Sequence, residues 1–250
     1  MRTALRAAAL AALCSSTLAS LPAFAGPADY VYSPIVEEGE REIDFKAGTA
    51  KLRDGGGRES AYSVGLGWGV NSWWFTEVYA KSHKEPGEKA GFDAFEWENK
   101  FQLTETGKYP VDIGLIVELE RPHDRSEGYE LRWGPLFQAD LTNRVQANLN
   151  ILVEKHYRAA EASKAELGYQ WQLKYRAQPA FEYGLQGFGD VGPLSNWEPR
   201  SEQPHIAGPA IFGKLHVAPH QAISYNAGLL FGLTHGAPST TLRMQAEYEF

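Results

Sequence analysis

The sequence predicts an all-β fold, a transmembrane antiparallel up-and-down β-barrel of about 12 strands. Apolar and polar residues alternate from residue 41 to residue 250, which is the periodicity of strands rather than helices. The alternating segments mostly run 11 to 15 residues. Strands of soluble proteins typically have about 5 to 6 residues, whereas these are long enough to cross a bilayer at a tilt. The connections between the segments also alternate between two kinds along the chain.

Residues 1–25 have the anatomy of a secretory signal peptide. They begin with Arg2 and Arg6, continue as an Ala/Leu run and end in an Ala-x-Ala pattern, so we expect export and cleavage after Ala25. Acylation of Cys14, as in a lipoprotein, is disfavoured because a bulky leucine precedes this cysteine. Since the chain has a single cysteine, the mature protein is expected to lack disulfides, catalytic thiols and thiolate metal sites.

Residues 26–40 precede the first predicted strand and combine apolar with acidic side chains. Tyr30, Tyr32 and Val36 are followed by several glutamates. The prolines and acids favour a flexible periplasmic extension. The alternative is a small plug inside the lumen, because an apolar cluster of this size could seal one mouth of a barrel. The barrel itself is expected to span residues 41–250.

Twelve segments carry the strand pattern. In residues 111–120, for example, every odd position is apolar, whereas Asp112, Glu118 and Glu120 occupy even positions. Because neighbouring residues of a strand point to opposite faces, each segment presents one apolar face to lipid. The predicted strands lie near residues 41–52, 60–71, 73–83, 91–104, 110–121, 129–141, 144–158, 164–177, 180–190, 206–217, 221–234 and 239–250.

Short turns and longer loops alternate along the chain, which sorts them onto opposite rims of the predicted barrel. The mostly tight connections are 71–72, 105–109, 142–143, 178–179 and 219–220. The longer or more charged connections are 54–57, 84–90, 122–128, 159–163, 191–205 and 235–238. An even number of strands with short turns on one rim is typical of outer-membrane barrels whose termini both lie in the periplasm.

The last strand carries the most specific motif of the chain. Residues 241–250 read TLRMQAEYEF, with alternating apolar positions and an aromatic last residue. This strand resembles the assembly signal of bacterial outer-membrane β-barrels. The resemblance implies that Tyr248 and Phe250 are read by the barrel assembly machinery. Porin-like, nucleoside-channel, phospholipase and lipid A deacylase barrels all include members of about this size, so the fold alone does not choose a function.

The polar phase of the strands supplies more acids than bases to the predicted lumen. We expect neighbouring strands to pair many of these charges, and a water path lined by the remaining carboxylates favours cations. The sequence therefore predicts a narrow, weakly cation-preferring channel for small solutes. The residues expected to line it are the acids Glu96, Glu98, Asp112, Glu118, Glu120 and Glu154 and the bases Arg132, Arg158, Lys174, Arg176 and Arg243.

Two alternatives remain open: a surface hydrolase acting on lipid or peptide, and a structural barrel without transport. No HExxH, GxSxG or glycine-rich phosphate loop occurs in the sequence. His123 and Asp124, at a loop rim, are the best acid/base candidates because barrel hydrolases resembling omptins use carboxylates and a histidine at the outer mouth. They can cooperate only in a loop, since adjacent strand residues point to opposite faces.

Glu154 and His156 share one strand face at i, i+2 spacing. This spacing permits a hydrogen bond or half of a metal site. Without a second pair of ligands, structural pairing is the favoured interpretation. We therefore expect no metal and no cofactor.

Charge and hydropathy exclude two further classes of protein. The chain has a formal net charge of −7 and no Lys/Arg-rich stripe, so it lacks the electrostatic footprint of nucleic-acid binding. A mean hydropathy of −0.38, with no long apolar run after the leader, excludes a bundle of transmembrane helices. The expected partners are outer-membrane lipid, lipopolysaccharide, the assembly machinery and small solutes, and the expected oligomeric state is a monomer.

Overall fold

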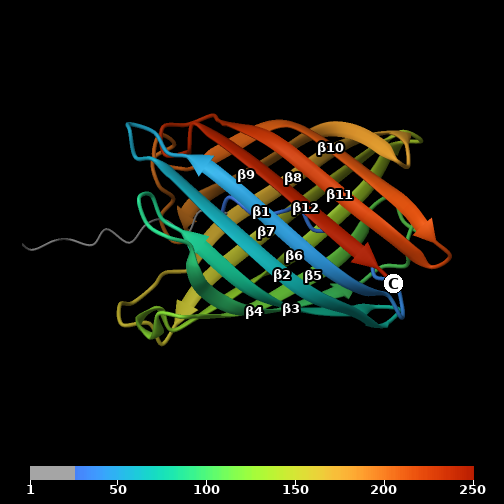
Figure 1. Cartoon of the computed structure of the whole chain (residues 1–250), viewed down its shortest axis with the longest axis horizontal. Helices are drawn as coiled ribbons and strands as arrows, with labels where there is room; N and C mark the ends of the chain where they lie inside the picture. Colours follow the sequence, from blue (N-terminus) through green and yellow to red (C-terminus); the bar gives the residue numbers. More distant parts are fainter. Residues whose placement is uncertain (1–25) are drawn as a thin grey trace, which may run out of the picture.

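The computed structural model describes residues 26–250, which form a closed barrel (Figure 1). Twelve strands pair in chain order, each antiparallel to the next, and the last strand closes the circle against the first. The predicted leader, its cleavage site and Cys14 lie outside the described residues. The strands are β1 (Arg41–Lys51), β2 (Arg58–Asn71), β3 (Trp74–Lys84), β4 (Gly91–Gln102), β5 (Asp112–Pro122), β6 (Tyr129–Thr142), β7 (Val145–Tyr157), β8 (Glu166–Gln178), β9 (Phe181–Pro193), β10 (His205–Ala218), β11 (Gln221–Gly232) and β12 (Thr240–Glu249).

The predicted twelve-stranded antiparallel barrel is confirmed, and the strand bounds differ from the predicted ones by a few residues. One change is between β4 and β5, where the predicted tight turn is a longer connection over residues 103–111. Side chains fold this connection onto itself. Asp112 Oδ1 accepts the N–H of Gly107 at 2.8 Å, and Thr104 Oγ1 accepts the N–H of Ile113 at 2.9 Å.

The connections lie on two rims, called here the loop side and the turn side (Figure 1). The loop side carries the connections that follow the odd-numbered strands β1 to β11, and the turn side carries the others together with the C-terminus. A short 3-10 helix, η1 (Arg125–Glu127), lies in the loop between β5 and β6. Among residues 26–250, no helix is long and apolar enough to span a membrane.

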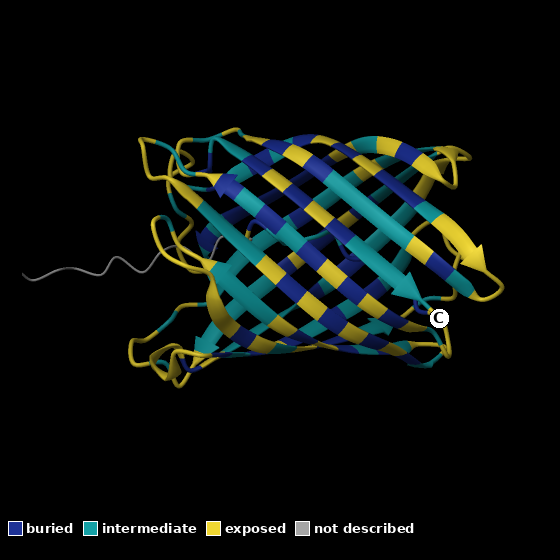
Figure 2. Cartoon of the chain, viewed as in Figure 1, coloured by how far each residue is buried: buried dark blue, intermediate teal, exposed yellow. Residues whose placement is uncertain are grey.

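Burial alternates along the strands, which gives the checkerboard of Figure 2. On the outer face, Leu66 of β2 and Phe95 of β4 are 62% and 61% exposed. On the inner face, Asp44 of β1 and Glu118 of β5 are 1% and 2% exposed. A protein dissolved in water has the opposite arrangement, with charges outside and large apolar side chains inside. The outer wall is therefore suited to lipid rather than to water.

Residues 26–40, called here the plug segment, lie inside the barrel and not below it as an extension. Pro27 lies against Gly48 of β1, and Pro34 lies against Gly114 of β5. The backbone N–H of Val36 donates to Gln102 Oε1 at 2.7 Å. Of the two arrangements expected from the sequence, the favoured periplasmic tail is thus replaced by the plug.

Apolar residues on the inner wall explain why the plug segment stays inside. Ile116, Leu136 and Leu152 form one buried cluster with Tyr32. A second buried cluster, which includes Phe188, Ile206, Leu230 and Ala237, packs against Val31. Removing these side chains from water stabilises the docked segment, whereas a solvated tail would leave both clusters wet.

Two glycines let the plug segment approach the wall closely. A Cβ at Gly48 would overlap the carbonyl oxygen of Pro27, and a Cβ at Gly69 would overlap that of Glu37. Gly69 also exchanges backbone hydrogen bonds with the segment: its oxygen accepts from Gly39 at 2.8 Å, and its N–H donates to Glu40 at 2.9 Å. The barrel sequence is therefore adapted to its plug at both ends of the segment.

Candidate functional site

A large cavity lies on each side of the plug segment. The loop-side cavity, of about 300 Å³, is lined by the first half of the segment from Gly26 to Tyr32. The turn-side cavity, of about 490 Å³, is lined by the second half and includes Glu37 and Glu40. Tyr30 and Tyr32 line both cavities and mark the constriction between them.

A lysine held between aromatic rings forms the constriction. Lys46 Nζ lies 3.6 Å from the ring centroids of both Tyr30 and Tyr79 and 3.3 Å from Asp44 Oδ2. Tyr79 donates its hydroxyl to the same Asp44 oxygen at 2.7 Å, and Tyr30 donates to Glu98 Oε2 at 2.8 Å. The predicted lumen acid Glu98 therefore fixes the plug segment in addition to lining the path. Cation–π contacts and charge-assisted hydrogen bonds keep this lysine in place.

On the loop-side part of the inner wall, Arg132 connects the wall to the plug segment. Its guanidinium lies 2.6 Å from Glu118 Oε2 and 3.1 Å from Asp29 Oδ2. A third donor of Arg132 lies 3.2 Å from the Tyr32 hydroxyl. Arg132 and Glu118, both predicted to line the lumen, thus pair with each other, and Arg132 also contacts two residues of the plug segment.

Lys81 of β3 joins two further predicted lumen acids. Its ammonium lies 3.0 Å from Glu96 Oε2 and also contacts Glu120 Oε2. All three residues line the loop-side cavity. The charges on this part of the wall form a network across β3, β4 and β5, as expected for buried charges that persist by pairing.

Two other predicted lumen bases, Arg243 of β12 and Lys174 of β8, contact residues of β9. Arg243 is buried, donates to Gln186 Oε1 at 2.7 Å and stacks over the ring of Phe188 at 4.9 Å. Lys174 lies 3.1 Å from Glu182 Oε2 and lines the turn-side cavity. Arg243 thus anchors the wall, whereas Lys174 faces the water path.

Three other predicted lumen residues lie at the rims. Arg176 pairs with Asp140 at 3.0 Å near the turn side, and Asp112 holds the connection that precedes β5. Arg158 is not on the inner wall, because β7 ends at Tyr157 and Arg158 adopts a left-handed φ of 57° in the following loop, with its side chain exposed. The alternation that placed it in the lumen stops one residue earlier.

Acids outnumber bases along both cavities. Seven Asp or Glu side chains and three Lys or Arg side chains line the loop-side cavity. The turn-side cavity has the same balance, with seven acids and three bases. A water path past these walls meets a negative potential on either side of the plug segment.

His123 and Asp124 do not form an acid/base pair. The ring of His123 packs edge-on against Phe92 at 5.7 Å between centroids. Asp124 caps η1 and accepts the hydroxyl of Ser126 at 2.7 Å and its N–H at 2.8 Å. These hydrogen bonds lower the pKa of Asp124, so it is a poor proton donor at neutral pH. These contacts order the loop between β5 and β6.

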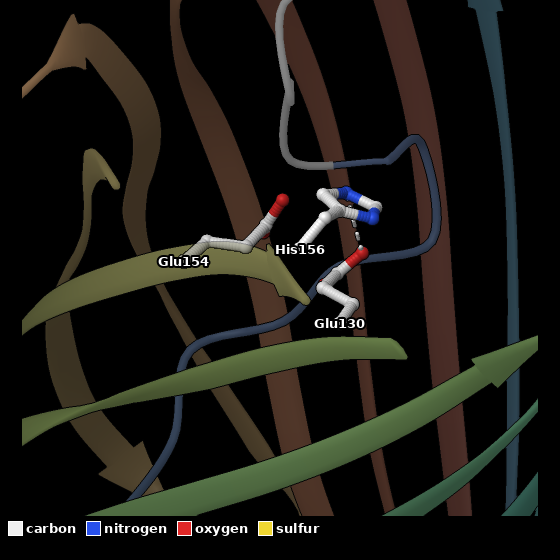
Figure 3. A group of neighbouring side chains, drawn as sticks. All are labelled: Glu130, Glu154 and His156. Carbon is white, nitrogen blue, oxygen red and sulfur yellow. Dashed lines mark ion pairs between the residues drawn. The ribbon is translucent and has the colours of Figure 1, made fainter. Parts of the chain in front are cut away.

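Glu154 and His156 have a third neighbour that the sequence did not indicate. Glu130 of β6 lies directly opposite His156 of β7, and its Oε2 is 3.6 Å from His156 Nε2 (Figure 3). Glu154 points toward the same place from the same strand as His156. All three line the loop-side cavity.

Asp29 and Tyr79 shape the lumen but escaped the sequence analysis. Asp44, Lys46 and Glu130 follow the polar phase expected of the inner wall, but their contacts were not predictable. The identity of their partners depends on which strands pair and in what register, and this is not a local property of the sequence. A usable signal existed for the plug segment. Ile116, Leu136 and Leu152 interrupt the polar phase of their strands, which indicates that something apolar covers them.

No protein-family model matches the chain, and no curated protein matches its sequence. Solved structures do match it. The NanC porin has a TM-score of 0.57 at 10% identity, and the match covers 83% of this chain and 98% of that one. An outer membrane channel from Pseudomonas putida F1 has a TM-score of 0.56 at 10% identity, covering 89% of this chain and 98% of that one.

The KdgM porin, in a structure with disordered oligogalacturonate, has a TM-score of 0.52 at 8% identity. This match covers 84% of the present chain and 99% of that one. At such low identities, likeness between structures speaks for the fold and not for the solute. The chain therefore has the β-barrel fold of outer-membrane porins and channels.

Proposed function

We propose that this protein is a bacterial outer-membrane channel for small solutes and that its lumen favours cations. The observation that carries the proposal is the acid excess, seven against three, along both cavities of the lumen. Carboxylates concentrate cations and repel anions wherever a water path passes them.

The outer wall of the barrel supports a location in the outer membrane. Large apolar side chains cover the face that points away from the lumen, and the fold is that of outer-membrane porins. Phe250 continues β12, and its N–H donates to the carbonyl oxygen of Arg41 at 2.9 Å, so the aromatic terminus lies at the closing seam. On this proposal the protein contacts outer-membrane lipid and lipopolysaccharide, is inserted by the assembly machinery through Tyr248 and Phe250, and works as a monomer.

The balance of charge argues against an anionic solute. Oligogalacturonate, present with the KdgM porin, is a polyanion. At the constriction, the ammonium of Lys46 is already paired with Asp44 and enclosed by two tyrosines. A polyanion passing the seven acids of either cavity would meet repulsion at each step.

The plug segment makes the channel narrow. Its contacts with the wall are hydrogen bonds, ion pairs and two small apolar clusters, with no covalent link. Passage of anything larger than a small hydrated ion therefore requires the segment to shift. This predicts a low conductance that increases when the segment is removed.

Planar bilayers test the proposal. With a salt gradient across the membrane, the mature chain is expected to give a small conductance and a reversal potential of cation-selective sign. Deletion of residues 26–36 is expected to raise the conductance and keep the sign. An anion-selective potential would contradict the electrostatic argument, and the absence of conductance from both folded proteins would favour a structural barrel.

Charge variants at the loop-side mouth sharpen the test. Asp93 and Glu127 line the loop-side cavity, so Asp93→Asn combined with Glu127→Gln should move the reversal potential toward zero. Glu88→Gln is the matched control, because Glu88 is exposed in the loop after β3 and lines neither cavity. Selectivity should weaken in 1 M salt, where the Debye length is about 3 Å. An equal effect of the control variant would show that surface charge, and not the cavity, sets the selectivity.

A further inference from the structure

Three side chains with metal-binding atoms converge on the loop-side cavity: Glu130, Glu154 and His156 (Figure 3). One ligand atom from each lies within 4.8 Å of the others. The pairing of β6 with β7 places Glu130 opposite His156, and Glu154 precedes His156 by two residues on the same face. Strand pairing thus supplies the third ligand that the sequence spacing lacked.

A backbone carbonyl group orients the imidazole of His156. Its Nδ1 lies 3.2 Å from the carbonyl oxygen of Glu127, which accepts only if Nδ1 carries the proton. Nε2 then presents a lone pair to Glu130 Oε2 at 3.6 Å, which is too long for a hydrogen bond. Two lone pairs facing each other are favourable only with a second proton or a cation between them. Metal-bound histidines are typically held in this way, with the second ring nitrogen donating to a carbonyl.

The spacing of the atoms suits a metal ion. Two ligands bound to Zn²⁺ at about 2.1 Å with tetrahedral geometry lie about 3.4 Å apart. The separation of His156 Nε2 and Glu130 Oε2 is 3.6 Å. Glu154, whose carboxylate lies within 4.8 Å of both, closes the remaining distance by a side-chain rotation.

The charges around the three residues also favour a cation. Arg132 and Lys81, the nearest bases of the wall, are each paired with two other carboxylates. Within residues 26–250, neither Glu130 nor Glu154 lies within ion-pair distance of a lysine or arginine. The adjoining cavity of about 300 Å³ gives an ion access from the loop side and leaves room for water ligands.

We propose that Glu130, Glu154 and His156 bind a divalent transition-metal ion of the Zn²⁺ class, with water completing its coordination. One imidazole and two carboxylates form a donor set that Zn²⁺ accepts, whereas Ca²⁺ and Mg²⁺ prefer oxygen ligands alone. The site deepens the proposed cation preference by naming a class of ion. It rests on the proposed function only for the route by which the ion arrives, because binding does not require conduction.

Calorimetric titration of Zn²⁺ into the folded barrel in detergent measures the site. We expect one Zn²⁺ per chain and no comparable binding of Ca²⁺ or Mg²⁺. His156→Ala and Glu130→Gln should each weaken Zn²⁺ binding at least about tenfold. Even the replacement of a residue that only hydrogen-bonds to a metal ligand typically lowers metal affinity 10- to 100-fold. Co²⁺ gives a second readout. When Co²⁺ is bound with a low coordination number, it shows a visible absorption band, and His156→Ala should abolish this band.

His235→Ala is the matched control. Its Nε2 also lies 3.6 Å from a carboxylate oxygen, that of Asp54, but the two residues are exposed on different loops. Within residues 26–250, they belong to no group of three possible metal ligands. This variant should bind Zn²⁺ like the parent chain. All variants are first checked for the gel mobility shift on heating that marks a folded barrel.

Three results would overturn the metal site: no Zn²⁺ binding by the folded parent chain, unchanged binding after replacement of both His156 and Glu130, or Ca²⁺ binding of equal affinity. Conductance of the same preparation separates this site from the proposed function. A cation-selective channel that does not bind Zn²⁺ overturns the site alone. A barrel that binds Zn²⁺ through these residues but shows no cation selectivity overturns the channel alone.

Discussion

The two faces of β5 differ in how regularly they follow their pattern. On the outer face, Ile113, Leu115, Val117 and Leu119 follow one another, and the first charged residue of this face is Arg121 at the loop-side end. On the inner face, Glu118 and Glu120 are joined by Ile116, which is fully buried under the plug segment. Between the two rims the outer wall meets one uniform solvent, lipid, and so its positions there obey the same rule. The inner wall meets water, ion-pair partners and a docked peptide, so each position depends on a specific neighbour.

The uniform outer wall predicts a large cost for a charge at its centre. Leu149→Arg, in the apolar face of β7, should destabilise the barrel by about 2 to 4 kcal/mol because the guanidinium enters the hydrocarbon. Leu141→Arg, near the turn-side end of β6, is the control at the membrane interface and should cost about 0 to 1 kcal/mol. Reversible denaturant unfolding in lipid vesicles measures both. Equal costs at the two depths would contradict a lipid-facing outer wall.

On the inner wall, the effect of a substitution should fall on the plug segment rather than on the barrel. Tyr32→Ala removes the ring that covers Ile116, Leu136 and Leu152, which should weaken docking by about 1.5 to 3 kcal/mol. Hydrogen exchange of the amides of residues 26–40 should accelerate accordingly, and the conductance should rise. Tyr157→Ala, which removes an exposed ring at the loop-side end of β7, should leave exchange in the segment unchanged. If the amides of residues 26–40 exchange as slowly in the Tyr32→Ala variant as in the parent chain, the apolar cluster does not hold the segment.

A smaller change in the same segment isolates one hydrogen bond. Tyr30→Phe deletes the hydroxyl that donates to Glu98 at 2.8 Å and should weaken docking by about 1 kcal/mol. Tyr225→Phe is the matched control, because its hydroxyl donates to Ala180 at the turn side and not to the plug segment. Exchange rates of residues 26–40 that respond equally to both variants would argue against a specific role for Tyr30.

The same contrast explains what could be predicted from the sequence. Strand number, strand phase and the alternation of turns and loops were predictable, because lipid and backbone pairing impose a period of two on every strand. The partners of inner-wall charges were not. Arg132 meets Glu118 on the neighbouring strand, and Lys81 meets Glu120 two strands away, so both contacts depend on the register of the whole sheet.

The metal-binding candidate and the position of the plug segment follow the same logic. Glu154 and His156 were recognisable by their spacing, but Glu130 joins them only through the pairing of β6 with β7. The prolines and acids of residues 26–40 favoured a tail because composition reports only on the segment itself. The evidence for a plug lay instead in the barrel, where Ile116, Leu136 and Phe188 occupy positions that alternation reserves for polar side chains.

A disulfide trap tests whether the plug segment lies inside the lumen. The mature chain is expected to lack cysteine, so Pro34→Cys with Gly114→Cys introduces a single pair, and a Cβ at Gly114 would lie 2.9 Å from that of Pro34. A small shift brings this distance into the roughly 3.5 to 4.5 Å range of disulfides. Pro34→Cys with Gly228→Cys is the control, since the nearest neighbours of Gly228 are Gln186, Leu230 and Arg243. We predict near-complete crosslinking of the first pair in the folded barrel and little of the second, whereas equal, low crosslinking of both would contradict a plug inside the lumen.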